Sequence, residues 1–303
     1  MKNITTLALF LAGAAFIALT SAAAQPAPAP VMAPPAPDFS KVEIKATDLG
    51  HGLTELVGGG GNITLAVGSD GIIMVDTEFA PLHDKIKAAI AKISPLPVKF
   101  VINTHYHVDH TEGNAAFVKE GAVTVAHANV VQHLLHPANG KPAPKEQIPE
   151  QTYNTLGTEV KIPGQTAELV YVPDAHTDGD TMVFWPAANV ISTGDVVASG
   201  QYPNIDVPGG GGIDGMIAGA NFVIAHSDAN TKIVPGHGPL TDRTHVIAYA
   251  KMLKTARDII AKAKAKGMTE DQVVQAHLLA SLDKTWKDPV ADRFPKLIYR
   301  SLK

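Results

Sequence analysis

The chain has 303 residues, of which 45% are hydrophobic and 18% are charged, and its formal net charge is −4 at neutral pH. These values exclude a disordered or fibrous protein and provide enough apolar residues for a substantial core. They include no basic block that would predict binding to nucleic acid, so a small-molecule substrate is the expected partner.

The beginning of the chain has the composition of an export signal followed by a spacer. Lys2 precedes an alanine-rich apolar stretch at residues 7–19, and small residues follow in TSAAAQ. This order predicts a signal peptide over residues 1–24, with an uncleaved membrane anchor as the alternative. The run PAPAPVMAPPAP predicts an extended proline-rich linker over residues 25–40. We therefore expect a periplasmic or secreted protein without stable membrane association after cleavage, whose folded domain covers residues 41–303.

Strands and helices are predicted in alternation after the linker. Three short β-rich runs separated by turn residues predict an antiparallel meander at residues 52–58, 62–68 and 71–77. Apolar residues at helical spacing, an early proline and a Ser-Pro pair after the end predict a helix over residues 81–93. The apolar run VKFVIN at residues 98–103 predicts a buried strand.

The alternation continues in the second half of the chain. The elements predicted there are short helices at 114–119 and 128–135, a strand at 122–127, a proline-rich loop at 137–149 that borders a site, strands at 158–162, 167–172, 181–185, 189–193 and 231–236, helices at 213–227 and 241–266, and one or two helices near the C-terminus. We therefore expect an α/β (α+β) fold, in which two mixed β-sheets pack face to face and helices flank both outer sides.

The segment THYHVDH follows the VKFVIN strand directly and contains four side chains that bind metal ions, namely His105, His107, Asp109 and His110. A loop that leaves a strand brings alternate side chains together. We therefore expect His105 and His107 to share one metal ion while Asp109 and His110 turn toward a second. Imidazole and carboxylate suit Zn²⁺, and thiolate is excluded because the chain has no cysteine.

Two metal ions need further ligands, and three candidates each follow an apolar run: His176 in YVPDAHTDGD, Asp195 in VISTGDVV and His237 in KIVPGHGP. Each alone has a simpler interpretation as a loop residue, because such glycine-containing pairs are common in turns. Their occurrence together with the first cluster favours metal ligands. The remaining histidines are interpreted as surface or core residues: His51, His83, His127, His133, His136, His226, His245 and His277.

The motifs THYHVDH, DAHTDGD, STGDVV and VPGHG, in this order, resemble those of the metallo-β-lactamase superfamily, and the resemblance covers about residues 45–255. It implies a four-layer αββα sandwich. The segment GNITLAVGSDGIIMVDT is also similar to the opening strands of the family, which implies that Asp76 supports the metal loop from behind. The ligand set implied by the family pattern has His105, His107 and His176 on a first zinc ion, Asp109, His110 and His237 on a second, and Asp195 bridging the two.

The resemblance also implies a reaction. Water between the two Zn²⁺ ions would be acidified and, as hydroxide, would attack a carbonyl group. Asp109 would orient that nucleophile and move a proton.

Two positions after the third motif separate the branches of the superfamily. The class B1 β-lactamases carry cysteine where this chain has Asp195, and usually lysine where it has Ala198. Acyl-homoserine lactonases carry tyrosine at the position of Ala198. The Asp-bridged ligand set resembles that of glyoxalase II, lactonases and related hydrolases.

We therefore expect an exported dinuclear zinc hydrolase that cleaves an amide or ester-type bond. Its leading substrate class is a β-lactam or lactone, with weak or promiscuous β-lactamase activity included. A glyoxalase II-like thioesterase is one alternative. Two others are a mononuclear iron persulfide dioxygenase that uses His105, His107 and His176, and a periplasmic zinc-binding protein without catalytic activity.

Two glycine-rich segments are predicted to be turns or flaps beside the metal site. They are GGGGN at residues 58–62 and VPGGGG at residues 207–212, and the first lacks the Gly-Lys-Ser/Thr sequence of a phosphate loop. Tyr202 and Asn204, which precede the second segment, are candidate substrate contacts.

Overall fold

The computed structural model describes residues 38–137, 140–288 and 290–302. The expected signal peptide and most of the expected linker lie outside these residues. The described chain begins with the 3-10 helix η1 (Phe39–Lys41), and the ring of Phe39 packs against that of Phe79 with 5.1 Å between their centroids. None of the helices in the described part of the chain combines the length and the apolar character needed to cross a lipid bilayer.

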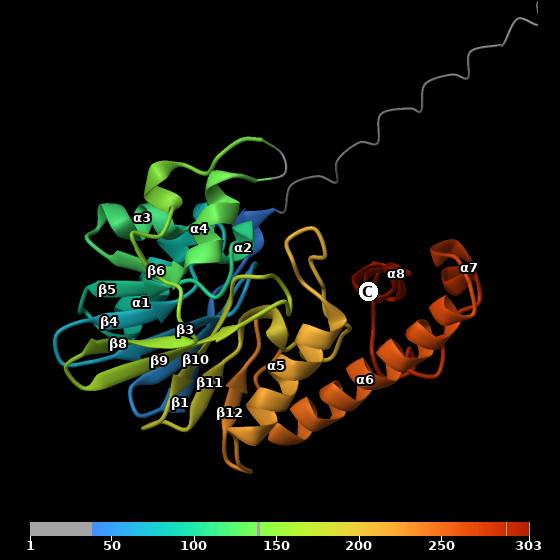
Figure 1. Ribbon diagram of the computed structural model, residues 1–303. Coiled ribbons are helices and arrows are strands. Elements are labelled where there is room, and N and C mark those ends of the chain that lie inside the picture. The colour runs from blue at the N-terminus through green and yellow to red at the C-terminus, as the bar shows by residue number, and fades with distance from the viewer. Residues whose placement is uncertain (1–37, 138–139, 289, 303) are drawn as a thin grey trace, which may run out of the picture. The chain divides into compact units, whose positions relative to one another are not determined.

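Two β-sheets form the centre of the fold (Figure 1). The first has seven strands, whose order across the sheet is their order along the chain: β1 (Lys45–Gly50), β2 (Leu53–Val57), β3 (Ile63–Val67), β4 (Ile72–Val75), β5 (Val98–Ile102), β6 (Val123–His127) and β7 (Gln151–Tyr153). Strands β1 to β4 pair antiparallel, and β4 to β7 pair in parallel. The predicted meander is confirmed. Strand β1 was not predicted, because its first four residues are exposed and carry no apolar alternation.

The second sheet has six strands, and its order across the sheet is β13-β12-β11-β10-β9-β8. Their bounds are β8 (Gly157–Ile162), β9 (Gln165–Val172), β10 (Asp180–Trp185), β11 (Val190–Ser192), β12 (Lys232–Val234) and β13 (Thr241–Asp242). Strands β8 to β11 are antiparallel neighbours, whereas β11 and β12 are parallel. A parallel neighbour requires a crossover connection, and a helix between β11 and β12 provides it.

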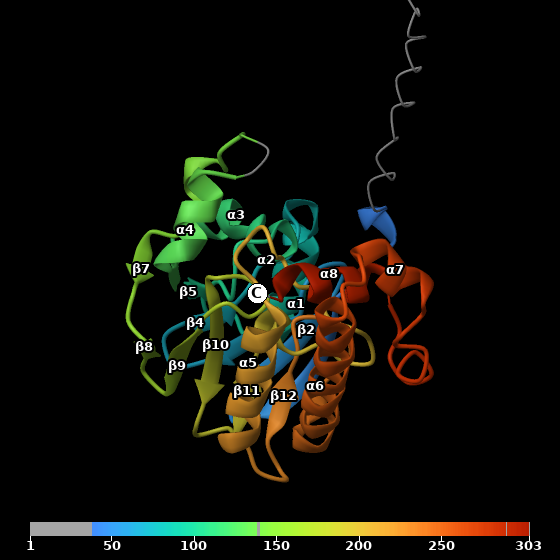
Figure 2. The ribbon, with the colours of Figure 1, turned by 45° about the vertical axis from the view of Figure 1, so that its right-hand side comes forward.

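Helices cover the outer face of each sheet. The first sheet is accompanied by η2 (Ala80–Leu82), α1 (His83–Ile93), α2 (Val108–Thr111), α3 (Asn114–Lys119), α4 (Ala128–Leu135) and η3 (Lys145–Gln147). The second is accompanied by η4 (Gly194–Val196), α5 (Ile213–Ala225), α6 (Arg243–Ala265), α7 (Glu270–Gln275) and α8 (Arg293–Ser301). Figure 2 shows α5 and α6 side by side along the second sheet.

The apolar core lies in three layers that follow this arrangement. Between the sheets, Ile73 and Ile102 of the first sheet belong to one buried cluster with Val183 and Trp185 of the second. A second cluster joins the outer face of the first sheet to α1, and a third joins the second sheet to α5, α6 and the C-terminal helices. The expected αββα sandwich is therefore confirmed, and it brings the strand ends of two sheets close together.

Candidate metal centre

Four loops carry the seven side chains predicted as metal ligands. Residues 104–110 leave β5 of the first sheet and enter α2, and the other three loops follow β9, β11 and β12 of the second sheet. The structure brings all seven side chains together in two neighbouring groups, and within each group the ligand atoms lie within 4.8 Å of one another. None of the other eight histidines, all of which are described, belongs to either group.

The first group consists of His105, His107, His176 and Asp195. Nε2 of His105 lies 3.1 Å from Nδ1 of His107, which in turn lies 2.9 Å from Nε2 of His176. Three ring nitrogens therefore converge on one point. Oδ2 of Asp195 lies 3.4 Å from Nε2 of His176, so a carboxylate oxygen completes a set of four donors of the kind that binds Zn²⁺.

The second group consists of Asp109, His110 and His237. Nε2 of His237 lies 3.2 Å from Oδ2 of Asp109 and 3.3 Å from Nε2 of His110. The other oxygen of Asp195, Oδ1, lies 3.3 Å from Nε2 of His110 and 3.5 Å from Nε2 of His237. Because Oδ2 of Asp195 faces the first group and Oδ1 faces the second, this carboxylate has the position that a bridging ligand requires.

Hydrogen bonds on the far side of two rings fix which nitrogen faces the centre. Nε2 of His107 donates to Oδ2 of Asp206 over 3.0 Å, and Nδ1 of His176 donates to the carbonyl oxygen of Asn204 over 3.0 Å. These acceptors require the proton on the outer nitrogen. The inner nitrogen of each ring therefore keeps its lone pair for a metal ion.

Asp76 supports two more rings from behind the metal loop. Its Oδ2 accepts from Nδ1 of His110 over 2.8 Å and from the hydroxyl of Thr104 over 2.7 Å, and its Oδ1 accepts from the backbone N–H of Thr104 over 2.8 Å. Because the Thr104 hydroxyl donates to Asp76, its oxygen accepts from Nδ1 of His105, 3.0 Å away. One buried carboxylate thus orients two ligands, as the resemblance implied.

Burial and charge act on the pKa values of the ligands in opposite directions. Burial lowers the pKa of His176 to about 4, which favours the neutral ring. Burial also lowers the pKa of His110, but the carboxylates of Asp195 and Asp76 outweigh it and raise that pKa well above its usual value. For Asp195 burial raises the pKa, and the imidazoles of His237 and His110 hold it well below its usual range.

The donor set fits divalent metal ions. Oδ1 of Asp195 is buried and accepts no hydrogen bond from any described residue. An ionised oxygen left in this way is costly, and a cation between the two groups would satisfy it. Imidazole nitrogens and carboxylate oxygens are ligands that zinc accepts.

The glycine-rich segment at residues 58–61 packs directly on the second group. The backbone N–H of Gly61 donates to the carbonyl oxygen of Asp109 over 3.0 Å. A Cβ atom on Gly61 would lie only 2.2 Å from Cε1 of His110, so no side chain fits there. Oε2 of Glu78 accepts from two further N–H groups of the segment, each over 2.8 Å. The turn predicted beside the metal site is therefore bonded to the loop that carries the ligands.

Two cavities open onto the ligands. One of about 300 Å³ is lined by Asp109, Asp195 and His237, together with Ala198 and other residues of its loop. The other, of about 620 Å³, shares Asp109 with the first and extends along residues 142–144. The prediction that the proline-rich loop borders the site is thus confirmed.

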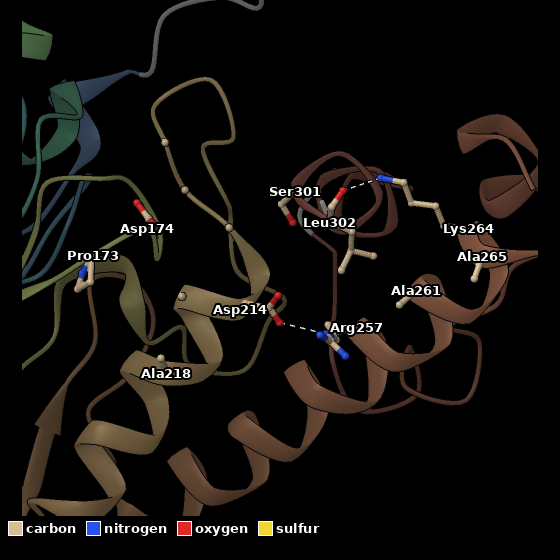
Figure 3. Close-up of a pocket in the computed structure, with 14 residues that line it drawn as sticks. Pro173, Asp174, Asp214, Ala218, Arg257, Ala261, Lys264, Ala265, Ser301 and Leu302 are labelled. Atoms are coloured by element: carbon tan, nitrogen blue, oxygen red, sulfur yellow. Dashed lines mark hydrogen bonds and ion pairs between the residues drawn. The ribbon is translucent and has the colours of Figure 1, made fainter. Parts of the chain in front are cut away.

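A larger cavity of about 730 Å³ lies between α5, α6 and the last described residues (Figure 3). It contains none of the seven ligands. Its cations already have partners, because Nε of Arg257 lies 3.0 Å from Oδ1 of Asp214, and Nζ of Lys264 donates to the carbonyl oxygens of Tyr299 and Leu302 over 3.0 and 2.6 Å. The cavity is therefore not part of the metal centre.

One predicted substrate contact is wrong and one is placed as expected. The Tyr202 side chain is only 2% exposed, stacks on the ring of Phe294 and donates its hydroxyl to Asp283 over 2.8 Å. Asn204 lines both cavities at the ligands. Asp206, which holds His107, was not predicted, since no motif distinguishes it from an ordinary loop aspartate.

Comparison with known proteins identifies the family of the chain. The family model described as the metallo-beta-lactamase superfamily matches residues 56–241. The 2,4-dinitroanisole O-demethylase subunit alpha of Nocardioides sp. (strain JS1661) is 29% identical over 145 residues, which are 47% of this chain and 43% of that protein. The chain therefore spans less than half the length of that relative. Metallo-beta-lactamase IND-1 of Chryseobacterium indologenes is 24% identical over 186 residues, 61% of this chain and 74% of that protein.

A solved structure has the same fold. The metallo-beta-lactamase from Pontibacter korlensis matches with a TM-score of 0.60 at 18% identity, covering 70% of this chain and 99% of that chain. The fold agrees with the two-sheet sandwich described above. The family model matches more than half of the sequence and includes all seven candidate ligands. The chain therefore belongs to the metallo-β-lactamase superfamily.

Proposed function

We propose that this protein is a dinuclear zinc hydrolase that cleaves an amide or ester-type bond of a small molecule, with a β-lactam or lactone as the leading substrate class. The observation that carries the proposal is the position of Asp195, whose two oxygens face the two groups of ligands. Membership of the superfamily supports a metal-dependent hydrolase.

The residues divide between the two ions as follows. The first zinc would be held by His105, His107 and His176, the second by Asp109, His110 and His237, and Asp195 would contact both. When bound, the ions would polarise a carbonyl group and lower the pKa of a water molecule. The chain itself orients the histidine rings, through the hydrogen bonds of Asp76 and Asp206, and provides a partly enclosed space for the substrate.

Asp109 is the residue that we assign to proton handling. Its side chain is 24% exposed and lines both cavities, so a substrate or water molecule would reach it. Burial raises its pKa, but the hydrogen bond from His237 and the charge of His110 lower it below its usual value. The ionised carboxylate would therefore orient an attacking water molecule and accept its proton.

Export is part of the proposal. The apolar stretch after Lys2 and the small residues of TSAAAQ support a signal peptide over residues 1–24. The mature protein would then be periplasmic or secreted. N-terminal sequencing of the protein recovered from the periplasm or medium tests this, and an intact Met1 would contradict it.

Metal analysis combined with a substrate panel tests the catalytic proposal. Purified protein should contain about two zinc ions per chain and hydrolyse at least one compound among penicillins, cephalosporins, carbapenems, homoserine lactones and glutathione thioesters. Preference for the thioester would identify a glyoxalase II-like enzyme. One equivalent of iron with oxygen consumption, or two zinc ions without any hydrolysis, would refute the proposal.

Variants separate the metal centre from the rest of the fold. His176→Ala removes a ligand of the first group and should abolish hydrolysis together with part of the zinc content. His226→Ala is the matched control, because His226 is exposed and belongs to neither group. Equal activity of the two variants would contradict the assigned site.

A further inference from the structure

Arg293 lines the cavity of about 300 Å³ that opens onto the ligands. It is the first residue of α8 and lies outside the segment matched by the family model, which ends at residue 241. Among the described residues that line this cavity, it is the only lysine or arginine, and His107, Asp109 and His237 line the same space. A permanent positive charge therefore borders the proposed reaction site.

The guanidinium group of Arg293 is incompletely paired. Its Nε is buried and has no hydrogen-bond partner among the described residues. The nearest carboxylate oxygen, Oδ1 of Asp288, lies 3.8 Å from Nε, which is too far for a hydrogen bond. The Asp288 oxygens already accept from the backbone N–H groups of Val290 and Phe294, over 3.2 and 2.9 Å. Since a guanidinium carries five N–H donors, Arg293 has donors left for a ligand.

The position of Arg293 is fixed by contacts between the C-terminal segment and the loop after β11. The backbone N–H of Tyr202 donates to the carbonyl oxygen of Lys287 over 2.8 Å. The ring of Tyr202 stacks on that of Phe294, with 4.4 Å between centroids and 19° between planes. Helix α8 also packs against α5 and α6, at the same end of the sheets as α2 (Figure 2). Tyr202 therefore acts as a buried anchor that holds α8 beside the site.

We propose that Arg293 binds a carboxylate group of the substrate while the scissile bond lies over Asp195. This rests on the proposed function, because it places the substrate across the ligands. A guanidinium is planar and binds a carboxylate through two parallel N–H···O bonds. Gln201, Pro203 and Asn204 of the same cavity are uncharged, and its carboxylates belong to the candidate ligands Asp109 and Asp195. Arg293 is therefore the side chain of this cavity that would select for negative charge. The substrate class is thus an anionic amide, lactone or thioester with a free carboxylate.

Two thiol probes test this without turnover, because a thiol binds zinc and the probes differ only in charge. They are 3-mercaptopropionate and 3-mercaptopropanamide, and their Kd values for zinc-loaded protein are measured by calorimetry. The wild-type protein should bind the carboxylate at least about tenfold more tightly. Arg293→Gln should bring the two Kd values close together. Arg293→Lys should retain part of the preference, because lysine keeps the positive charge but cannot form the two parallel N–H···O bonds of a guanidinium.

The control is Arg257→Gln, which removes an arginine from the separate cavity of Figure 3 and should leave the Kd ratio unchanged. Arg293→Gln should also keep the wild-type zinc content, because Arg293 is not a ligand. A preference that survives in Arg293→Gln, its absence from the wild type, or zinc loss in the variant would overturn the proposal. A protein that hydrolyses nothing in the substrate panel would refute the proposed function alone, since the Kd ratio is measured without turnover.

Discussion

Replacing Asp206 by asparagine should weaken zinc binding at the first group while leaving the ligands themselves in place. Oδ2 of Asp206 accepts from Nε2 of His107 over 3.0 Å and from the hydroxyl of Tyr106, and its Oδ1 accepts from the N–H of Gly209 over 3.1 Å. All three partners donate, so both ends of the side chain must accept. Asparagine has one accepting end, and its NH₂ group must face a donor in either orientation.

The size of the effect depends on which end the NH₂ group occupies. If the NH₂ group of the new asparagine faces His107, Nε2 of the ring must accept and the ring proton moves to Nδ1. Nδ1 is the atom that points at the other candidate ligands, so a metal ion could bind there only after this proton is removed. If the NH₂ group faces Gly209, the bond to His107 is kept but loses the carboxylate charge. Loss of a carboxylate partner of a metal-binding histidine costs about 10 to 100-fold in metal affinity, or about 1.4 to 2.8 kcal/mol. We expect the lower end for the second orientation.

The assay is competition for zinc against a chromophoric chelator, in which a separate Kd is measured for the first and for the second zinc ion. Asp178→Asn is the matched control, because Oδ1 of Asp178 lies 2.7 Å from Nε2 of His133, a histidine in neither group. Thermal unfolding of both zinc-free variants measures any general loss of stability. Zinc affinity within twofold of wild type in Asp206→Asn would refute the reasoning, as would an equal loss in Asp178→Asn.

Three further changes test the centre. Asp195→Asn removes the charge between the groups and should leave no more than about one zinc per chain by elemental analysis; two retained zinc ions would contradict the bridging role. Gly61→Ala forces a Cβ to 2.2 Å from the His110 ring and should lower the free energy of unfolding by about 1–3 kcal/mol, measured by denaturant titration. An unchanged free energy of unfolding would show that residues 58–61 move away from His110 without cost. Removing zinc should lower the Tm by about 10–20 °C in scanning calorimetry, since two sites at 100 Kd contribute about 2.7 kcal/mol each, and an unchanged Tm would contradict metal binding to the folded state.

The sequence predicted the sandwich because its strands are marked by apolar runs between turn residues. Helix α6 was equally clear, since its apolar residues recur at helical spacing over 23 residues. Strand β1 has no such apolar pattern in the sequence. It lies at the edge of the first sheet and is mostly exposed, so its pairing with β2 comes from backbone hydrogen bonds that any side chains allow.

The ligand set was predictable for a different reason. Each of the seven residues lies in the segment that follows a strand, and the ends of these strands in the two sheets meet on one side of the sandwich. The supporting residues were not predictable in this way. Asp206 and Glu78 act through backbone groups and ring nitrogens that only the folded loops bring near, and Asn204 supports His176 through its carbonyl oxygen, which carries no sequence signal.

The residues that line the site come from two parts of the chain. The candidate metal ligands all lie within the segment that the family model matches, whereas Arg293, which lines the same cavity, lies beyond it. At Ala198, where the resemblance places lysine or tyrosine in two better-defined branches, this chain has a small side chain, and the backbone carbonyl oxygen of Ala198 accepts from Nε2 of His245. The proposed binding of a carboxylate therefore uses a residue from another part of the sequence, Arg293, and the stacking of Tyr202 on Phe294 holds its helix α8 in place. Under this proposal the choice of substrate depends on a side chain outside the segment that the family model matches, and the Kd ratios of the Arg293 variants test it.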